Sequence, residues 1–268
     1  MGHLWHITVV IEAGWEFKKQ MFNNNRKMIK EIKDEDLTTS PACTKPPVVG
    51  STVYLMDCVA GMKEYPDKWF DLALADPPYG IGEHGGKIRT NKKRPCYELR
   101  KETPKYKNKG WDLSIPDMEY FTELFRVSKN QIIFGANYFT QFLPASMGWI
   151  FWDKKFENTV FSDGEFIYTS FSRGAKKFVQ SSKAETNGGL NRIHPTQKTI
   201  KLYDFCLQFA KVEPGMRIID THLGSQSSRI AADKAGLDFT GFEIDKDYFD
   251  AGEKRYQNYK SQLRIEGW

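Results

Sequence analysis

The sequence predicts an α/β fold with a mostly parallel sheet, on two observations. Short apolar runs bounded by turn residues alternate with longer segments whose apolar residues recur at helical spacing. In the C-terminal third a strand, a small-residue loop, a helix and a second strand follow one another, which is half of a nucleotide-binding α/β unit. A chain of 268 residues is long enough to bury a core of its own.

The expected elements follow from these two patterns. Apolar runs rich in β-branched or aromatic residues predict strands over 53–56, 70–75, 131–134, 149–152, 165–171, 216–219 and 239–244. Helical spacing predicts a short helix after the 53–56 strand and longer helices over 117–127, 196–209, 225–235 and 248–263. Thr196 is the predicted start of the 196–209 helix, and Pro214-Gly215 turns the chain into the strand that follows.

Changes in composition divide the chain into a domain and its insertions. Residues 1–48 are predicted to be an N-terminal extension and linker, and residues 49–268 the folded domain, with a basic insertion at about 82–110 and a second polar loop at about 172–193. From Lys87 to Lys109 there are ten Lys or Arg residues and two Glu, a local excess larger than the net charge of +5 for the whole chain. Such a run is often a solvated loop, but its place directly after the 70–75 strand favours a loop that binds phosphates.

Several classes of protein are not expected. The chain has no apolar stretch near the ~18 residues of a membrane span and no signal-peptide pattern, so a cytoplasmic location without membrane contact is expected. The cysteines Cys43, Cys58, Cys96 and Cys206 are scattered without a C-x-x-C pair. This spacing favours reduced thiols over disulfides or a zinc site, and we expect no metal.

The most informative residues are Asp76-Pro77-Pro78-Tyr79, which follow the apolar 70–75 strand. The end of a strand is the usual place for a ligand site in an open α/β sheet. Two prolines fix φ, remove two N–H donors and force the chain out of the sheet. The carboxylate, the rigid Pro77 carbonyl and the aromatic ring then suit an exocyclic amine on a planar base. A plain proline-terminated strand is the competing interpretation.

These four residues resemble the catalytic motif of the DNA amino-methyltransferases that use S-adenosylmethionine. The likeness continues at His194-Pro195-Thr196-Gln197-Lys198, at Asp220-Thr221-His222-Leu223-Gly224-Ser225 and at Glu243-Ile244-Asp245. Segments around Gly135–Phe139, Trp152–Lys154 and Asp163–Glu165 are similar to phage and prophage-type adenine methylases. The motif order resembles the permuted β group, and the likeness spans about residues 53–255. It implies a Rossmann-like class I methyltransferase fold with a mostly parallel seven-stranded sheet, helices on both faces and a circularly permuted motif order.

The C-terminal loop favours S-adenosylmethionine over a dinucleotide. Glu243 stands 23 residues after Asp220, near the spacing expected of a ribose-binding acid. The loop after Leu223 has one glycine, Gly224, where a pyrophosphate would need several. The resemblance implies that the cofactor-binding residues are Asp57, Cys58, His194, Gln197, Lys198, Asp220, His222, Gly224, Ser225, Ser227, Ser228 and Glu243.

Three positions depart from the family pattern. Gln226 stands where a second glycine is usual, Thr221-His222 replaces Pro-Phe, and Thr199 replaces a proline. If position 226 needs a positive φ, a glutamine there costs roughly 1 kcal/mol or more. The sequence therefore leaves open a variant loop, which we favour, and a degenerate cofactor site.

The resemblance implies site-specific methylation of adenine N6 in double-stranded DNA by base flipping, with Asp76, Pro77, Pro78 and Tyr79 as catalytic residues and Tyr79 stacked on the flipped base. Expected DNA-binding residues are Lys87, Arg89, Lys92, Lys93, Arg94, Asn137 and Tyr138; Trp152 and Phe156 are weaker candidates for the pocket wall. Cytosine-N4 methylation, methylation of RNA or of a protein amide, and a catalytically silent DNA-binding homologue stay open. So does a homodimer, because relatives of this group often dimerise.

Overall fold

A computed structural model describes residues 50–82, 109–155, 162–186 and 191–266, all within the unit Cys43–Trp268. The strands are β1 (Ser51–Leu55), β2 (Phe70–Ala75), β3 (Ser128–Phe134), β4 (Trp149–Asp153), β5 (Gly164–Thr169), β6 (Lys176–Val179), β7 (Arg217–Asp220) and β8 (Asp238–Glu243). The helices are α2 (Cys58–Met62), α3 (Met118–Val127), the 3-10 turn η2 (Ala136–Tyr138), α4 (Ile200–Ala210), α5 (Ser227–Lys234) and α6 (Lys246–Glu266). The predicted extension 1–48 and the residues Lys87–Arg94 lie outside this description.

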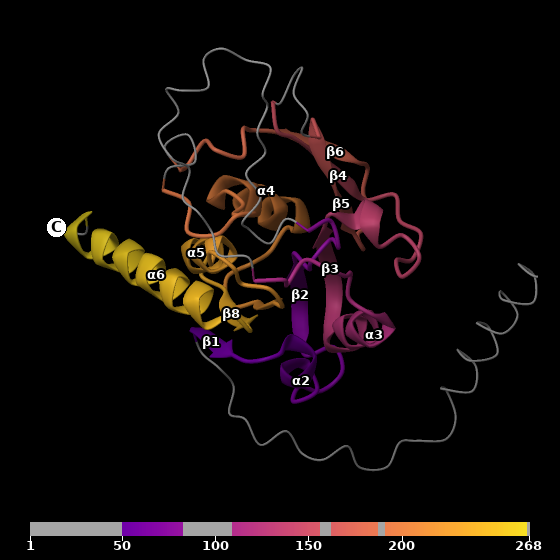
Figure 1. Cartoon of the computed structure of the whole chain (residues 1–268), viewed down its shortest axis with the longest axis horizontal. Helices are drawn as coiled ribbons and strands as arrows, with labels where there is room; N and C mark the ends of the chain where they lie inside the picture. Colours follow the sequence, from indigo (N-terminus) through magenta and orange to yellow (C-terminus); the bar gives the residue numbers. More distant parts are fainter. Residues whose placement is uncertain (1–49, 83–108, 156–161, 187–190, 267–268) are drawn as a thin grey trace, which may run out of the picture. The chain divides into compact units, whose positions relative to one another are not determined.

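The described strands form one mixed sheet in the order β1-β8-β7-β2-β3-β5-β4-β6 (Figure 1). Neighbours run parallel except that β5 is antiparallel to both β3 and β4. The sheet has eight strands where seven are expected, because Lys176–Val179 forms a strand inside the polar tract 172–193. That strand lies at the sheet edge with mostly exposed side chains and is held by backbone pairing with β4, so it carries no hydrophobic pattern.

Helices cover both faces of the sheet, as the strand and helix alternation predicts (Figure 1). The alternation along β2 shows why: Leu72 and Leu74 enter the core shared with α4 and α5. Ala73 and Ala75 enter the opposite core, which contains side chains of α2 and α3. A strand buried on both faces has a continuous apolar sequence, which is the pattern that predicted this element.

The sheet order brings the two main motifs to the same edge. β2 and β7 are adjacent and parallel, with Leu74 opposite Asp220. β7 in turn pairs in parallel with β8, with Asp220 opposite Gly241. The residues that follow β2, β7 and β8 therefore emerge side by side, as expected for a ligand site in this class of fold.

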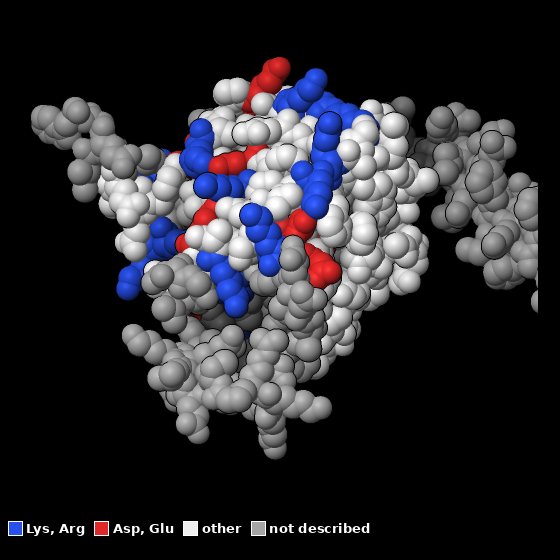
Figure 2. Space-filling view, turned by 90° about the horizontal axis from the view of Figure 1, so that it is seen from above, with Lys and Arg blue, Asp and Glu red and all other residues white. Residues whose placement is uncertain are grey.

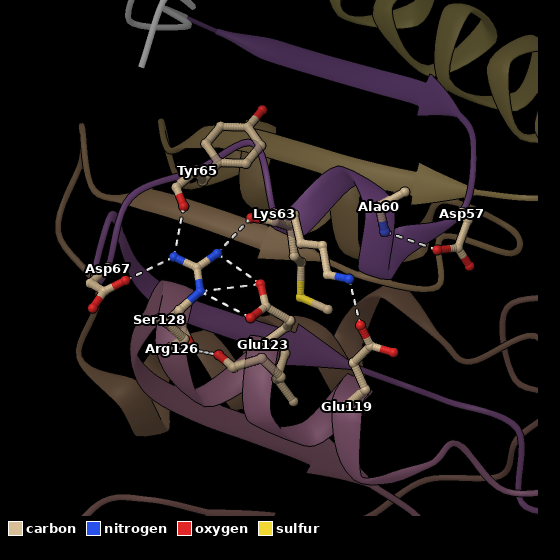
Figure 3. A network of polar contacts seen from close by, with 11 residues as sticks. Asp57, Ala60, Lys63, Tyr65, Asp67, Glu119, Glu123, Arg126 and Ser128 are labelled. Carbon is tan, nitrogen blue, oxygen red and sulfur yellow. Dashed lines mark hydrogen bonds and ion pairs between the residues drawn. The ribbon is translucent and has the colours of Figure 1, made fainter. Parts of the chain in front are cut away.

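A polar network fixes α2 against α3 (Figure 3). Arg126 donates to the carbonyl oxygens of Tyr65 (2.9 Å) and Met62 (3.1 Å) and forms ion pairs with Asp67 and Glu123, both at 2.8 Å. This clamp holds the helix whose first turn carries Cys58 and whose N-cap is Asp57. Within the part of the chain that the structure describes, no helix is long and apolar enough to cross a membrane.

Candidate active site

Asp76 stands directly after β2, and its Oδ1 atom has two charged or polar partners. It accepts a hydrogen bond from the Tyr79 hydroxyl at 2.7 Å and lies 2.5 Å from the Lys198 ammonium. No described residue forms a hydrogen bond or ion pair with the other oxygen, Oδ2. The resemblance predicts that Lys198 contacts the cofactor, whereas its ammonium in this structure contacts the catalytic corner.

A second carboxylate, that of Glu165 on β5, faces the first across the tyrosine hydroxyl. Glu165 Oε1 lies 2.8 Å from Tyr79 Oη and 3.3 Å from Lys198 Nζ, and Oε2 accepts from Lys154 Nζ at 2.9 Å. Lys198 Nζ is also 3.1 Å from Tyr79 Oη. We call these five residues, Asp76, Tyr79, Lys154, Glu165 and Lys198, the acid–lysine network.

The acid–lysine network is buried and its charges balance. The side chains of Lys198, Glu165 and Asp76 are 4%, 8% and 16% exposed. Burial raises the pKa of Glu165, but Lys198 and Lys154 outweigh it and hold that pKa at about 2. Burial, together with the charge of Glu165, raises the pKa of Asp76 despite the nearby Lys198. The two carboxylates therefore have different proton affinities, a common arrangement at catalytic sites.

Aromatic residues enclose Tyr79. Its ring stacks on Tyr138 with centroids 5.1 Å apart and an interplanar angle of 14° and meets Phe139 edge-on at 5.9 Å. Gly135 has φ of 63°, and a Cβ there would lie 2.3 Å from the Tyr79 ring. The predicted base-stacking face of Tyr79 is thus covered by Tyr138, itself 39% exposed, and Asn137 beside it is exposed. A flipped base stacks on Tyr79 only after Tyr138 moves aside.

A pocket opens beside this corner, where β1, β7 and β8 end. It encloses about 280 Å³, its open mouth included, and is lined by Met56, Asp57, Cys58, Thr221, His222, Phe242, Glu243 and Ile244. Four of the predicted cofactor-binding residues are in this lining: Asp57, Cys58, His222 and Glu243. Glu243 accepts the backbone N–H groups of Gly224 (2.8 Å) and Asp245 (2.9 Å), and Ile244 is 68% exposed. Carboxylate oxygens retain lone pairs after one such bond, so Glu243 can still accept from hydroxyl groups.

Other predicted cofactor-binding residues shape the loop between β7 and α5. Asp220 accepts from the backbone N–H of His222 at 2.9 Å and from the Ser228 hydroxyl, and burial raises its pKa to about 7. Ser227 donates to the backbone oxygen of Lys198 at 2.8 Å, and its hydroxyl lies 3.1 Å from that of Ser225. These hydroxyls therefore fix the loop and tie it to Lys198.

The variant positions in this loop have structural explanations. Gln226 adopts φ of 58°, the strained conformation that the sequence raised as a concern. Its side chain is fully buried against Gly252 of α6 and accepts from Arg229 at 2.8 Å, so it points away from the pocket. His222 bonds Thr221 at 3.0 Å through Nδ1 and lies 4.0 Å from the Cys58 sulfur. Burial lowers the pKa of His222 to about 4.

The His194–Lys198 segment differs from its prediction in one respect. The helix begins at Ile200, with Thr199 rather than Thr196 as the N-cap, because Thr199 Oγ1 accepts from the Leu202 N–H at 3.3 Å. His194 packs between Trp111 (centroids 5.3 Å apart) and Tyr248 (4.3 Å), and its ring is 3.6 Å from where a Gly224 Cβ would lie.

Gln197 accepts from the backbone N–H of Ile193 at 3.0 Å. His194 and Gln197 thus close over the loop, while neither lines the pocket. Trp152 is buried and donates to the Gln180 carbonyl at 2.8 Å, so it is a packing residue; Phe156 lies outside the described residues.

The family follows from a match to residues 100–254, more than half of the chain, with the family model for N6/N4 DNA methylases. The chain belongs to this DNA methylase family. S-Adenosylmethionine is the cofactor of the family. Sequence comparison with curated proteins returns no match.

Solved structures of DNA methylases share the fold. The cytosine-N4-specific PvuII DNA methyltransferase superposes with a TM-score of 0.51 at 13% identity, covering 80% of this chain and 89% of that one. The M1.HpyAVI–SAM complex has a TM-score of 0.49 at 16% identity and covers 76% and 98%. TTHA0409 of Thermus thermophilus, a DNA modification methylase by its description, has a TM-score of 0.48 at 15% identity and covers 78% and 94%. The likeness to the PvuII enzyme supports the α/β methyltransferase fold.

Sequence reasoning missed Glu165 and Lys154 as members of this site. Both occur in the segments that resemble adenine methylases, but no motif assigns them a role. An ionised Glu buried in a strand whose neighbours are apolar is the signal that could have found Glu165, because such a charge needs a partner.

Proposed function

We propose that this DNA methylase transfers a methyl group from S-adenosylmethionine to adenine N6 in double-stranded DNA. The observation that carries the proposal is the Asp76 carboxylate, fixed through Oδ1 by Lys198 and Tyr79 at the strand end next to the cofactor loop. An Asp at the first motif position is commoner among adenine enzymes than among cytosine-N4 enzymes, which favours N6 as the target.

The site residues act by positioning. The lone pair of an exocyclic amine is delocalised into the ring, so the nitrogen is a poor nucleophile. Hydrogen bonds from the amine to Asp76 and to the Pro77 carbonyl favour a tetrahedral nitrogen and localise its lone pair. The base reaches this corner by leaving the duplex, and Tyr138 moves aside so that the base stacks on Tyr79.

The pocket residues are suited to hold the cofactor. Glu243 would accept from the ribose hydroxyls, the exposed Ile244 would cover the adenine, and Asp57 and His222 would face its polar edge. When bound, S-adenosylmethionine supplies an electrophilic methyl group. The side chain of Gln226 points away from this pocket, which favours a functional variant loop over a degenerate site.

The DNA interface is proposed to be the face around Tyr138 and the basic insertion. Viewed from above, the described surface carries Lys and Arg side chains with Asp and Glu between them (Figure 2). A mixed surface of this kind attracts phosphates weakly. The excess charge in Lys87, Arg89, Lys92, Lys93 and Arg94 therefore supports the insertion as the main phosphate contact.

The test is transfer of a tritiated methyl group to unmethylated genomic DNA, followed by nucleoside mass spectrometry. N6-methyladenosine is the expected product, and N4-methylcytosine would replace the adenine assignment. Asp76→Ala is expected to abolish transfer while equilibrium binding of S-adenosylmethionine changes less than about threefold. Absence of transfer by the wild-type chain, or full activity of Asp76→Ala, would overturn the proposal.

A further inference from the structure

The Tyr79 hydroxyl lies between two carboxylates and has one proton to give. Asp76 Oδ1 is 2.7 Å away and Glu165 Oε1 is 2.8 Å away. Since a phenol donates one hydrogen bond at a time, the hydroxyl serves either Asp76 or Glu165. Lys198 contacts both acids, at 2.5 Å and 3.3 Å, and can compensate whichever one the hydroxyl leaves.

We propose that Glu165 is a positioning residue for methyl transfer: it accepts the Tyr79 proton and thereby leaves Asp76 free to accept from the target amine. The inference deepens the proposed function and rests on it. Each hydrogen bond that Asp76 accepts from the protein spreads its negative charge and weakens it as an acceptor for the amine. Directing the hydroxyl to Glu165 removes one such competitor at the oxygen that already contacts Lys198.

Two features of the structure fit this role better than simple structural support. Glu165 is held from its other oxygen by Lys154, which leaves Oε1 directed at the hydroxyl. The two lysines also balance the two carboxylates, so Glu165 remains an ionised acceptor inside the protein. A carboxylate needed for packing alone would not have to face the side chain that contacts Asp76.

The main variant is Glu165→Gln, which keeps the shape but replaces the ionised acceptor with a neutral amide. The Tyr79 hydroxyl then turns to Asp76, and kcat is expected to fall on the order of tenfold to hundredfold, the equivalent of one hydrogen bond to a charged group. The KM for S-adenosylmethionine is expected to stay within about twofold, because Glu165 does not line the cofactor pocket.

A second variant separates positioning from structural support. Tyr79→Phe keeps the ring and removes the competing proton, so the double variant Tyr79→Phe/Glu165→Gln is expected to have a higher kcat than Glu165→Gln alone. Removing a further hydrogen bond from a merely structural network would instead lower activity or stability again. Glu123→Gln is the matched control: Glu123 is 13% exposed and paired with Arg126 (Figure 3), and its loss should leave kcat unchanged.

The measurement is single-turnover methyl transfer, normalised to the folded fraction by S-adenosylmethionine binding stoichiometry. A lower kcat for Glu165→Gln with unchanged KM and rescue by Tyr79→Phe supports the inference. An unchanged kcat, or a double variant slower than Glu165→Gln, overturns it while wild-type transfer keeps the proposed function intact. A wild-type chain that transfers no methyl group overturns both.

Discussion

Lys198→Met is the perturbation that tests the electrostatics of the site most directly. The ammonium is 4% exposed, 2.5 Å from Asp76 and 3.3 Å from Glu165. Methionine keeps most of the volume and removes the charge, which leaves two buried carboxylates facing each other with Lys154 on the far oxygen of Glu165. Breaking a buried ion pair in this way costs about 3–5 kcal/mol.

The pKa of Glu165 gives an independent magnitude. Its value of about 2 in the folded protein against an ordinary 4.5 corresponds to about 3 kcal/mol at 1.36 kcal/mol per pH unit. Because this pKa is lowered, the stabilisation is present above pH 4.5 and is lost as the pH falls toward 2. Lys198 has its pKa raised by Asp76 and Glu165 against the effect of burial, so its contribution is complete below pH 10.5. The loss in Lys198→Met is therefore expected to be largest near pH 8 and to shrink toward pH 4.5.

The assay is urea unfolding of wild type and variant at pH 8 and pH 5. We expect a loss of about 3 kcal/mol at pH 8 and a clearly smaller one at pH 5. Lys246→Met is the control, since that side chain is 71% exposed and its pair with Asp250 should contribute less than about 1 kcal/mol. A loss below about 1 kcal/mol at pH 8, or one that grows as the pH falls, would refute the account of Lys198 as the counter-ion of both acids.

Two further substitutions probe the loops around the site. Gly135→Ala should lower both stability, by about 1 kcal/mol or more, and kcat, because φ is 63° and the new Cβ would meet the Tyr79 ring at 2.3 Å; urea unfolding and methyl transfer measure this, with Gly174→Ala, which has open space around it, as the control. Gln226→Gly should leave the affinity for S-adenosylmethionine within about threefold, because the side chain packs on Gly252, and calorimetric binding showing a tenfold change would contradict that.

The core of the fold was predictable because its strands carry their own signals. β2 is buried on both faces, so its sequence is continuously apolar, and the two prolines that follow Asp76 mark where it ends. β7 and β8 are similarly buried and separated by one helix. These local patterns fix which residues lie at the strand ends, which is where the catalytic and cofactor motifs were predicted.

The remaining features depend on tertiary pairing that the sequence does not display. Strand β6 has mostly exposed side chains, so only its pairing with β4 makes it a strand. The start of α4 was wrong by one turn because Thr196 and Thr199 both suit an N-cap, and the Glu185 carboxylate, distant in sequence, binds the first N–H groups at Ile200 and Lys201. Glu165 enters the site through its register with Trp152 across β4 and β5, which no motif encodes.

Lys198 links the two halves of the proposed reaction centre. Its backbone oxygen accepts from Ser227 in the cofactor loop, and its ammonium contacts Asp76, which is 122 residues earlier in the chain. The loop and the carboxylate are thus held by the same residue, so a displacement of the loop moves the counter-ion of Asp76. Gln226 takes its strained conformation in this loop while its side chain is anchored on α6, and this anchor therefore also helps to keep Lys198 in place. A family member can then lose the usual glycine at this position and keep the geometry of the catalytic corner, provided that packing against the C-terminal helix replaces the lost backbone freedom.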